Sequence, residues 1–107
     1  MEANIIDKTI ETVCRVFMVG RDELLHSRLR HRYLTDARMT LCVLLDEQGI
    51  GRRLIAHTVN RTLVNVEYSL HRLFYYAEKE PALAEKIDAA RKLIIDNERL
   101  EVRGYRL

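Results

Sequence analysis

The residues with the clearest potential for chemistry are arginines at alternate positions in the first half of the chain. From Arg28 to Arg38 there are four arginines, one aspartate and one histidine. An arginine guanidinium pairs bidentately with phosphate and can also enter a narrow DNA minor groove. Two further arginines begin a later helical pattern, so the predicted phosphate-contacting set is Arg28, Arg30, Arg32, Arg38, Arg52 and Arg53. Ordinary surface charge on a solvated loop is the alternative interpretation.

A second set of side chains, at residues 61–65, has types that can contact DNA bases. Asn65 can form a bidentate pair with adenine, and Leu63 or Val64 can meet a thymine methyl group. Arg61 can approach a phosphate or a guanine. Helix capping is the competing role of Thr62, and partial burial in the core is that of Val64. The predicted base-reading set is therefore Arg61, Thr62, Leu63, Val64 and Asn65.

Helices must position both sets, because apolar residues recur at helical spacing along the chain. The pattern predicts helices over residues 4–18, 21–27, 33–47, 52–59, 63–78 and 82–98. Asn4 and Thr62 are the predicted N-caps of two of them, and Asn60 suits a left-handed turn. No segment alternates apolar and polar residues long enough to predict a strand. We therefore expect an all-α fold of five to six helices.

Residues 52–73 have the outline of a helix-turn-helix, with a short helix, a tight turn and a longer second helix. The second helix of such a unit usually reads a DNA major groove. The outline by itself permits this function without establishing it.

Length and composition favour one domain over residues 1–107, with a core at about 4–98 and a tail at 99–107. Apolar residues make up 48% of the chain, enough for a core without disulfides or metals. Cys14 and Cys42 lie in apolar helical patterns and are predicted to be buried thiols, a disulfide being the alternative. No signal peptide is recognised and no apolar run approaches the roughly 18 residues of a membrane span. We expect a cytoplasmic protein without a membrane partner.

Charge is distributed unevenly, although the net charge of +2 is too small to identify a polyanionic partner. Residues 77–102 contain five lysines or arginines against seven acids, so this stretch is mildly acidic. The chain lacks a glycine-rich phosphate loop and a nucleophile motif, which argues against an enzyme and a bound nucleotide. The histidines lack metal-ligand spacing, so no metal or other cofactor is predicted: they are His26, His31, His57 and His71.

Several of these segments together resemble one known family. Residues 27–32, 37–39 and 54–56, followed by Arg61 and Val66, resemble the C-terminal DNA-binding domain (domain IV) of the bacterial replication initiator DnaA. The resemblance extends from about Ile5 to Ile94, in the same order and nearly the same spacing. It implies a Trp-repressor-like helix-turn-helix fold, and a basic loop and second helix that bind double-stranded DNA.

The chain departs from that family where the family reads bases. The family signature is close to GRDHTTV, and residues 60–66 read NRTLVNV here. Arg61 and Val66 match, but Thr62 and Leu63 replace Asp and His, and Val64 and Asn65 replace two threonines. The family's ATPase domain is also absent, so the resemblance implies neither helicase loading nor ATP hydrolysis.

Two functions of different classes follow. The first is a double-stranded DNA-binding module in replication, transcription regulation or mobile DNA, which the retained arginines favour. The second is a small helical protein–protein interaction module that kept the fold but lost sequence-specific DNA binding, which the changed signature favours.

Overall fold

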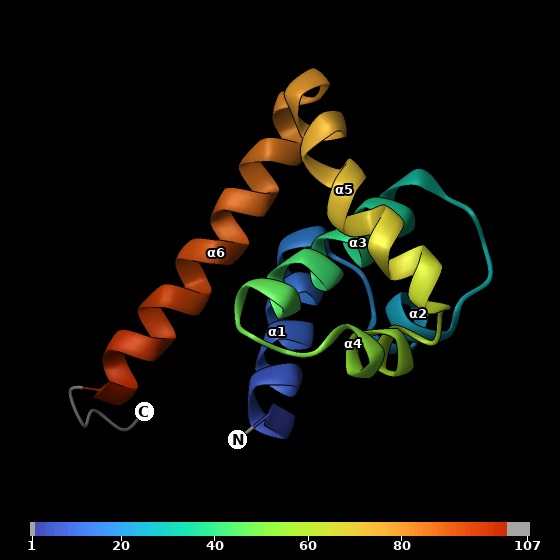
Figure 1. Cartoon of the computed structure of the whole chain (residues 1–107). Helices are drawn as coiled ribbons and strands as arrows, with labels where there is room; N and C mark the ends of the chain where they lie inside the picture. The colour runs from blue at the N-terminus through green and yellow to red at the C-terminus, as the bar shows by residue number, and fades with distance from the viewer. Residues whose placement is uncertain (1, 103–107) are drawn as a thin grey trace.

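The computed structural model describes residues 2–102, and the side chains of residues 2–97. Its elements are α1 (Glu2–Phe17), α2 (Arg21–His26), α3 (Arg32–Glu47), α4 (Arg52–Val59), α5 (Leu63–Lys79) and α6 (Pro81–Val102) (Figure 1). These residues form six helices and no strand, so the predicted all-α fold is confirmed. None of the described helices is long and apolar enough to cross a membrane.

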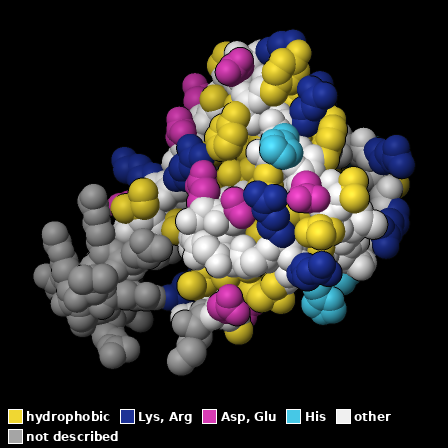
Figure 2. Space-filling model, viewed as in Figure 1, with side chains coloured by type: hydrophobic (Ala, Val, Ile, Leu, Met, Phe, Trp, Pro, Cys, Tyr) yellow, Lys and Arg dark blue, Asp and Glu magenta, His cyan; other side chains and the backbone are white. Residues whose placement is uncertain are grey.

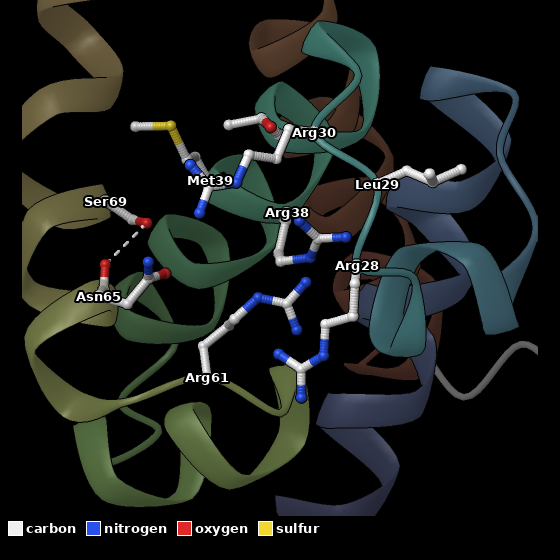
Figure 3. Close-up of a pocket in the computed structure, with 9 residues that line it drawn as sticks. Arg28, Leu29, Arg30, Arg38, Met39, Arg61, Asn65 and Ser69 are labelled. Carbon is white, nitrogen blue, oxygen red and sulfur yellow. Dashed lines mark hydrogen bonds between the residues drawn. The ribbon is translucent and has the colours of Figure 1, made fainter.

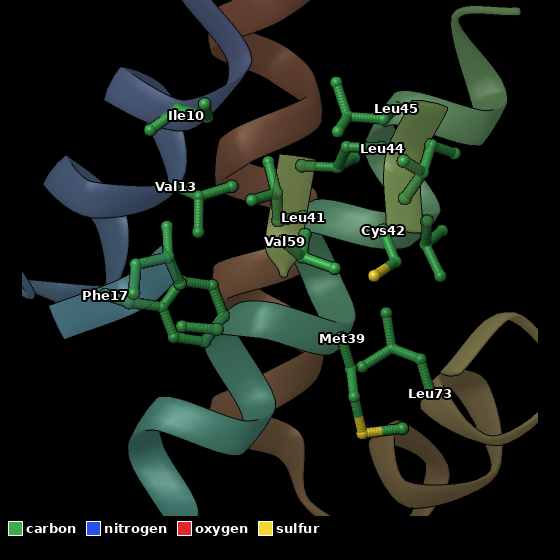
Figure 4. Packing of buried hydrophobic residues seen from close by; sticks show 14 of the residues in the cluster. Ile10, Val13, Phe17, Met39, Leu41, Cys42, Leu44, Leu45, Val59 and Leu73 are labelled. Carbon is green, nitrogen blue, oxygen red and sulfur yellow. The ribbon is translucent and has the colours of Figure 1, made fainter. Parts of the chain in front are cut away.

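The centre of the fold is α3, which contacts each of the other five helices. Every residue from 37 to 45 is buried, so α3 has little solvent-facing surface along that stretch. A helix covered on all sides belongs to the interior of a domain. Val13 of α1 points toward Leu41 of α3, and both side chains are fully buried (Figure 4). Burying such a side chain stabilises the fold by roughly 1.5–3 kcal/mol.

The last two helices meet at a tight turn and diverge from it, and α6 packs on α1 (Figure 1). Its buried residues Leu83, Ile87 and Ala90 recur at helical spacing, as predicted. Pro81 begins the helix, at a position where the missing N–H of proline costs no hydrogen bond. The amino end of α5 therefore lies away from the tight α5–α6 turn.

The turn between α4 and α5 forms as the sequence predicts. Asn60 adopts the left-handed conformation, with φ 59° and ψ 45°, and ends α4. The Oγ1 atom of Thr62 accepts a hydrogen bond from the backbone N–H of Asn65 at 3.1 Å, so Thr62 is the N-cap of α5. Both residues act through local backbone geometry, which explains why local sequence was sufficient to predict them.

Two helix boundaries differ from the predictions by more than one residue. The first helix begins at Glu2, so Asn4 lies inside α1 and is not its N-cap. Glutamate in a first turn complements the helix dipole and supports the earlier start. The last helix continues to Val102 instead of ending at 98, because no glycine or proline interrupts it. Of the predicted tail, residues 103–107 lie outside the described residues.

Both cysteines are free thiols, and burial raises the pKa of each. Cys42 is 1% exposed and its pKa is raised to about 12, whereas Cys14 is half-buried. The prediction of buried thiols is confirmed for Cys42, whereas Cys14 is only partly buried, and the two do not form a disulfide.

Because the thiolate is the reactive form, we expect Cys42 to resist 5,5′-dithiobis(2-nitrobenzoate) in the native protein at mildly alkaline pH. Cys14 should react slowly, and both should react at once in urea. The Cys14→Ser variant assigns the two phases. Rapid reaction of Cys42 in the folded variant would contradict its burial.

Candidate nucleic-acid interface

A hollow of about 410 Å³ opens where the loop after α2 meets α3 and the start of α5 (Figure 3). We call it the arginine hollow, because four of its lining residues are arginines and none is acidic. It is lined by Arg28, Leu29, Arg30, Thr35, Arg38, Met39, Arg61, Asn65 and Ser69. Four of the predicted DNA-contacting arginines thus lie together, although 33 positions separate the first from the last.

The inner part of the hollow is formed by Arg38, which is only 8% exposed. Its Nε donates a hydrogen bond to the carbonyl oxygen of Leu24 at 2.9 Å, and its Nη2 donates to that of Ser27 at 3.3 Å. These carbonyls belong to the last turn and C-cap of α2. The last carbonyls of a helix lack intrahelical donors and carry partial negative charge. Arg38 therefore attaches the end of α2 to the central helix.

Arg61 reaches the same place from the turn between α4 and α5. Its Nη2 donates to the carbonyl oxygen of Ser27 at 2.8 Å, and its Nη1 donates to those of Asn60 and Val59 at 3.0 and 3.3 Å. Ser27 thus receives hydrogen bonds from both Arg38 and Arg61. The two arginines connect the basic loop to the helix-turn-helix, a structural role that the sequence did not indicate.

The charges of the hollow are not neutralised by the protein. Within residues 2–97, no ion pair involves Arg28, Arg30, Arg38 or Arg61. Burial lowers the pKa of Arg38, and the positive charges of Arg61 and Arg28 lower it further. Burial also lowers the pKa of Arg61, with Arg28 adding to the effect. The guanidiniums remain charged at neutral pH, so an anion entering the hollow relieves their mutual repulsion.

The outer part of the hollow carries Arg28 and Arg30, both exposed on the loop between α2 and α3. The guanidinium of Arg28 lies beside that of Arg61, on the side away from Arg38, whereas that of Arg30 turns toward Met39 (Figure 3). On the molecular surface, the basic side chains over this loop have no acidic side chain beside them in the view (Figure 2). Over the middle of the same face, basic and acidic side chains alternate.

The other three predicted phosphate contacts lie elsewhere. Arg32 forms an ion pair with Glu80 at the start of α6. Arg52 pairs with Glu67 of α5, its Nη1 lying 3.3 Å from the Glu67 Oε2. Arg53 is exposed and has no ion pair within residues 2–97. The six arginines therefore do not form one surface, and acidic neighbours reduce the positive potential around Arg32 and Arg52.

The predicted base-reading residues are exposed to different degrees. Val64 is 75% exposed, so the alternative that it is partly core is wrong. Asn65 is exposed at the edge of the arginine hollow, and its side-chain amide forms no hydrogen bond within residues 2–97. Leu63 is half-buried and lines a shallow hollow with Arg52 and Arg53 on the other side of α5. The exposed first turn of α5 thus lies between arginines on both sides.

Some residues of the site had no sequence prediction. Ser69 lines the arginine hollow one helical turn beyond Asn65, and its Oγ donates to the Asn65 carbonyl oxygen at 3.1 Å. The i, i+4 spacing of these two residues was a signal that could have identified Ser69. Leu29 and Met39 gave no such signal, since only the fold brings the loop against α3.

Further along α5 lie three tyrosines, Tyr68, Tyr75 and Tyr76. Tyr68 and Tyr75 are 48% and 45% exposed, and the guanidinium of Arg72 lies over both rings, 5.7 and 5.6 Å from the centroids. The Tyr68 and Tyr76 hydroxyls form a hydrogen bond at 2.8 Å. With Arg72, these rings therefore form an aromatic and basic surface along α5 from Tyr68 to Tyr76.

No protein-family model, curated protein or solved structure matches the chain. Within the described residues, no group of three or more histidine, cysteine, aspartate or glutamate side chains could hold a metal ion. The function must therefore be argued from the arrangement of arginines around the start of α5.

Proposed function

We propose that this chain is a double-stranded DNA-binding module in which the first turn of α5 enters the major groove. The observation that carries the proposal is the position of that turn. It lies between the arginine hollow on one side and Arg53 on the other, and none of these arginines has an acidic partner within residues 2–97. A helix in the major groove has a phosphate backbone on each side, and this arrangement matches that geometry.

Phosphate contacts would position the protein, and the exposed residues of the first turn would read bases. Val64 and Asn65 are the residues free to do so, since Thr62 is occupied as the N-cap. The free amide of Asn65 suits an adenine, and the methyl groups of Val64 suit a thymine. The amino end of α5 also presents the positive end of a helix dipole to the backbone.

The resemblance to the DnaA C-terminal domain supports the same function, in replication, transcription regulation or mobile DNA in the bacterial cytoplasm. Arg61, which that family shares, has a structural role here through its bonds to Ser27. The family's base-reading residues are replaced at 62–65, so the proposal includes a preferred DNA sequence that differs from the family's, or a weak preference only.

Fluorescence anisotropy with a labelled duplex at several salt concentrations tests the proposal. If Arg28, Arg30, Arg53 and Arg61 each neutralise a phosphate, the slope of log affinity against log salt should be about −3.6. Absence of binding at low salt would overturn the proposal.

Asn65 should affect which sequence is bound more than how strongly DNA in general is bound. On a duplex selected from a random pool with the wild-type protein, we expect Asn65→Ala to weaken binding by roughly 1–3 kcal/mol, without a change in the salt slope. Asn97→Ala, an exposed asparagine on α6, is the matched control and should bind like the wild type. An equal loss on random-sequence duplexes would argue against base reading by Asn65.

A protein–protein interaction module is the second candidate, and the aromatic surface of α5 favours it. Phe74 and Tyr75 are 41% and 45% exposed on the same helix as Tyr68. Exposed aromatic side chains next to arginine are typical of the residues that dominate protein interfaces. This function would be preferred if the protein failed to bind duplex DNA at low salt.

A further inference from the structure

The arginine hollow has more positive charge than a single phosphodiester of duplex DNA requires. Four guanidiniums line it, and no carboxylate among its lining residues offsets them. A backbone phosphodiester carries one negative charge and has a nucleotide attached on each side. A phosphomonoester carries close to two negative charges at neutral pH and has three free oxygens. The charge of the hollow therefore fits a phosphomonoester better than a diester.

Unused donors inside the hollow point to the same ligand. The Nη1 group of Arg38 and the Nε group of Arg61 have no hydrogen-bond partner within residues 2–97, although the other nitrogens of both side chains do. The side chain of Arg28, whose guanidinium lies beside that of Arg61, forms no hydrogen bond with that part of the chain either (Figure 3). These donors come from three separate segments and meet in one place. Such an arrangement can surround the oxygens of a terminal phosphate.

The depth of the hollow also favours a terminal phosphate as the ligand. Arg38 is 8% exposed, so only a group that projects from its molecule can reach that guanidinium. An internal phosphate of a duplex is held in a continuous backbone and cannot project in this way. The volume of about 410 Å³ lies within the roughly 300–1,000 Å³ of small-molecule sites.

We propose that the arginine hollow is a phosphomonoester-binding site, with Arg28, Arg38 and Arg61 around the phosphate. The phosphate can come from a free small molecule or from the 5′-terminal phosphate of a nucleic acid. The site goes beyond the proposed function, because it recognises a terminal phosphate and not the phosphodiester backbone of a duplex.

Calorimetric titration with monomethyl phosphate and dimethyl phosphate tests the site, because the two probes differ mainly in charge and in free oxygens. We expect binding of the monoester and at least tenfold weaker binding of the diester, at one ionic strength. Affinity for the monoester should fall as the pH drops through about 6, where its second proton binds. Arg28→Ala should weaken binding of the monoester at least about tenfold, because it removes a charged hydrogen-bond donor. Arg15→Ala, an exposed arginine of α1 outside the hollow, is the matched control.

Two duplexes that differ only in a 5′-phosphate or a 5′-hydroxyl then separate the sources. Tighter binding of the phosphorylated duplex indicates a nucleic-acid end, and equal binding with retained monomethyl phosphate affinity indicates a small molecule. Absence of monomethyl phosphate binding, or equal affinity for the two esters, would overturn this proposal even if duplex DNA binds. Conversely, monoester binding without duplex binding would leave this site in place and reject the DNA-binding function.

Discussion

The double variant Arg28→Ala/Arg30→Ala is expected to bind duplex DNA about 60-fold more weakly than the wild type at about 0.1 M monovalent salt. Each phosphate contact contributes about 0.9 to the log–log salt slope, which corresponds to about eightfold in affinity at that concentration. The loss of two contacts therefore weakens binding about 60-fold, and the salt slope should become less steep by about 1.8. Titrations at several salt concentrations measure both quantities.

Folding should not obscure this result, because both side chains are exposed and neither takes part in an ion pair within residues 2–97. The control is Arg15→Ala/Lys92→Ala, which removes the same charge from exposed positions on α1 and α6, outside the hollow. We expect the control to retain most of the affinity and the full slope. Equal losses in the two double variants would show that net charge, and not the arginine hollow, determines binding.

The second large effect is expected on stability, from Arg38→Ala. This change removes two hydrogen bonds and leaves the buried Leu24 carbonyl oxygen without its donor, while Ser27 keeps its bond from Arg61. An unsatisfied buried group costs roughly 1–3 kcal/mol, and the lost packing of the side chain adds to that cost. We therefore expect the free energy of unfolding to fall by about 2–4 kcal/mol, measured by urea unfolding with far-ultraviolet circular dichroism.

Two further variants identify the cause of the stability loss in Arg38→Ala. Arg38→Lys keeps the charge but lacks the planar fork that spans the two carbonyls, so it should recover only part of the loss. Arg28→Ala, at an exposed arginine of the same hollow, should change stability by less than about 0.5 kcal/mol. If Arg38→Ala were as stable as Arg28→Ala, the bonds to the end of α2 would not be holding the loop.

The helices and the central turn were predictable because they depend on neighbours in sequence. Apolar spacing located all six helices, and Asn60 and Thr62 identified the turn by their own backbone and capping preferences. The two errors, at Asn4 and at the end of the last helix, fall where no strong start or stop residue is present. Helix ends without such residues depend on packing, which a local pattern does not contain.

Which arginines form ion pairs and which line the hollow could not be predicted in the same way. Glu80 is 48 positions from Arg32, and Glu67 is 15 positions from Arg52, so each pair exists only after the helices pack. Arg38 was predicted to contact a phosphate. Because α3 is covered on all sides from residue 37 to 45, its side chain is buried instead.

The sequence by itself determined the all-α class, the order of the helices, the turn before α5 and the supply of arginines, because all of these follow from residue type and short-range spacing. Only the tertiary structure decided which arginines meet and which are neutralised, and that Arg38 and Arg61 hold the end of α2. Electrostatic interactions act across distances in space and depend on burial, and both are set by contacts between segments far apart in the chain. The site is therefore a property of the packed helices, although the sequence could name each of its arginines in advance.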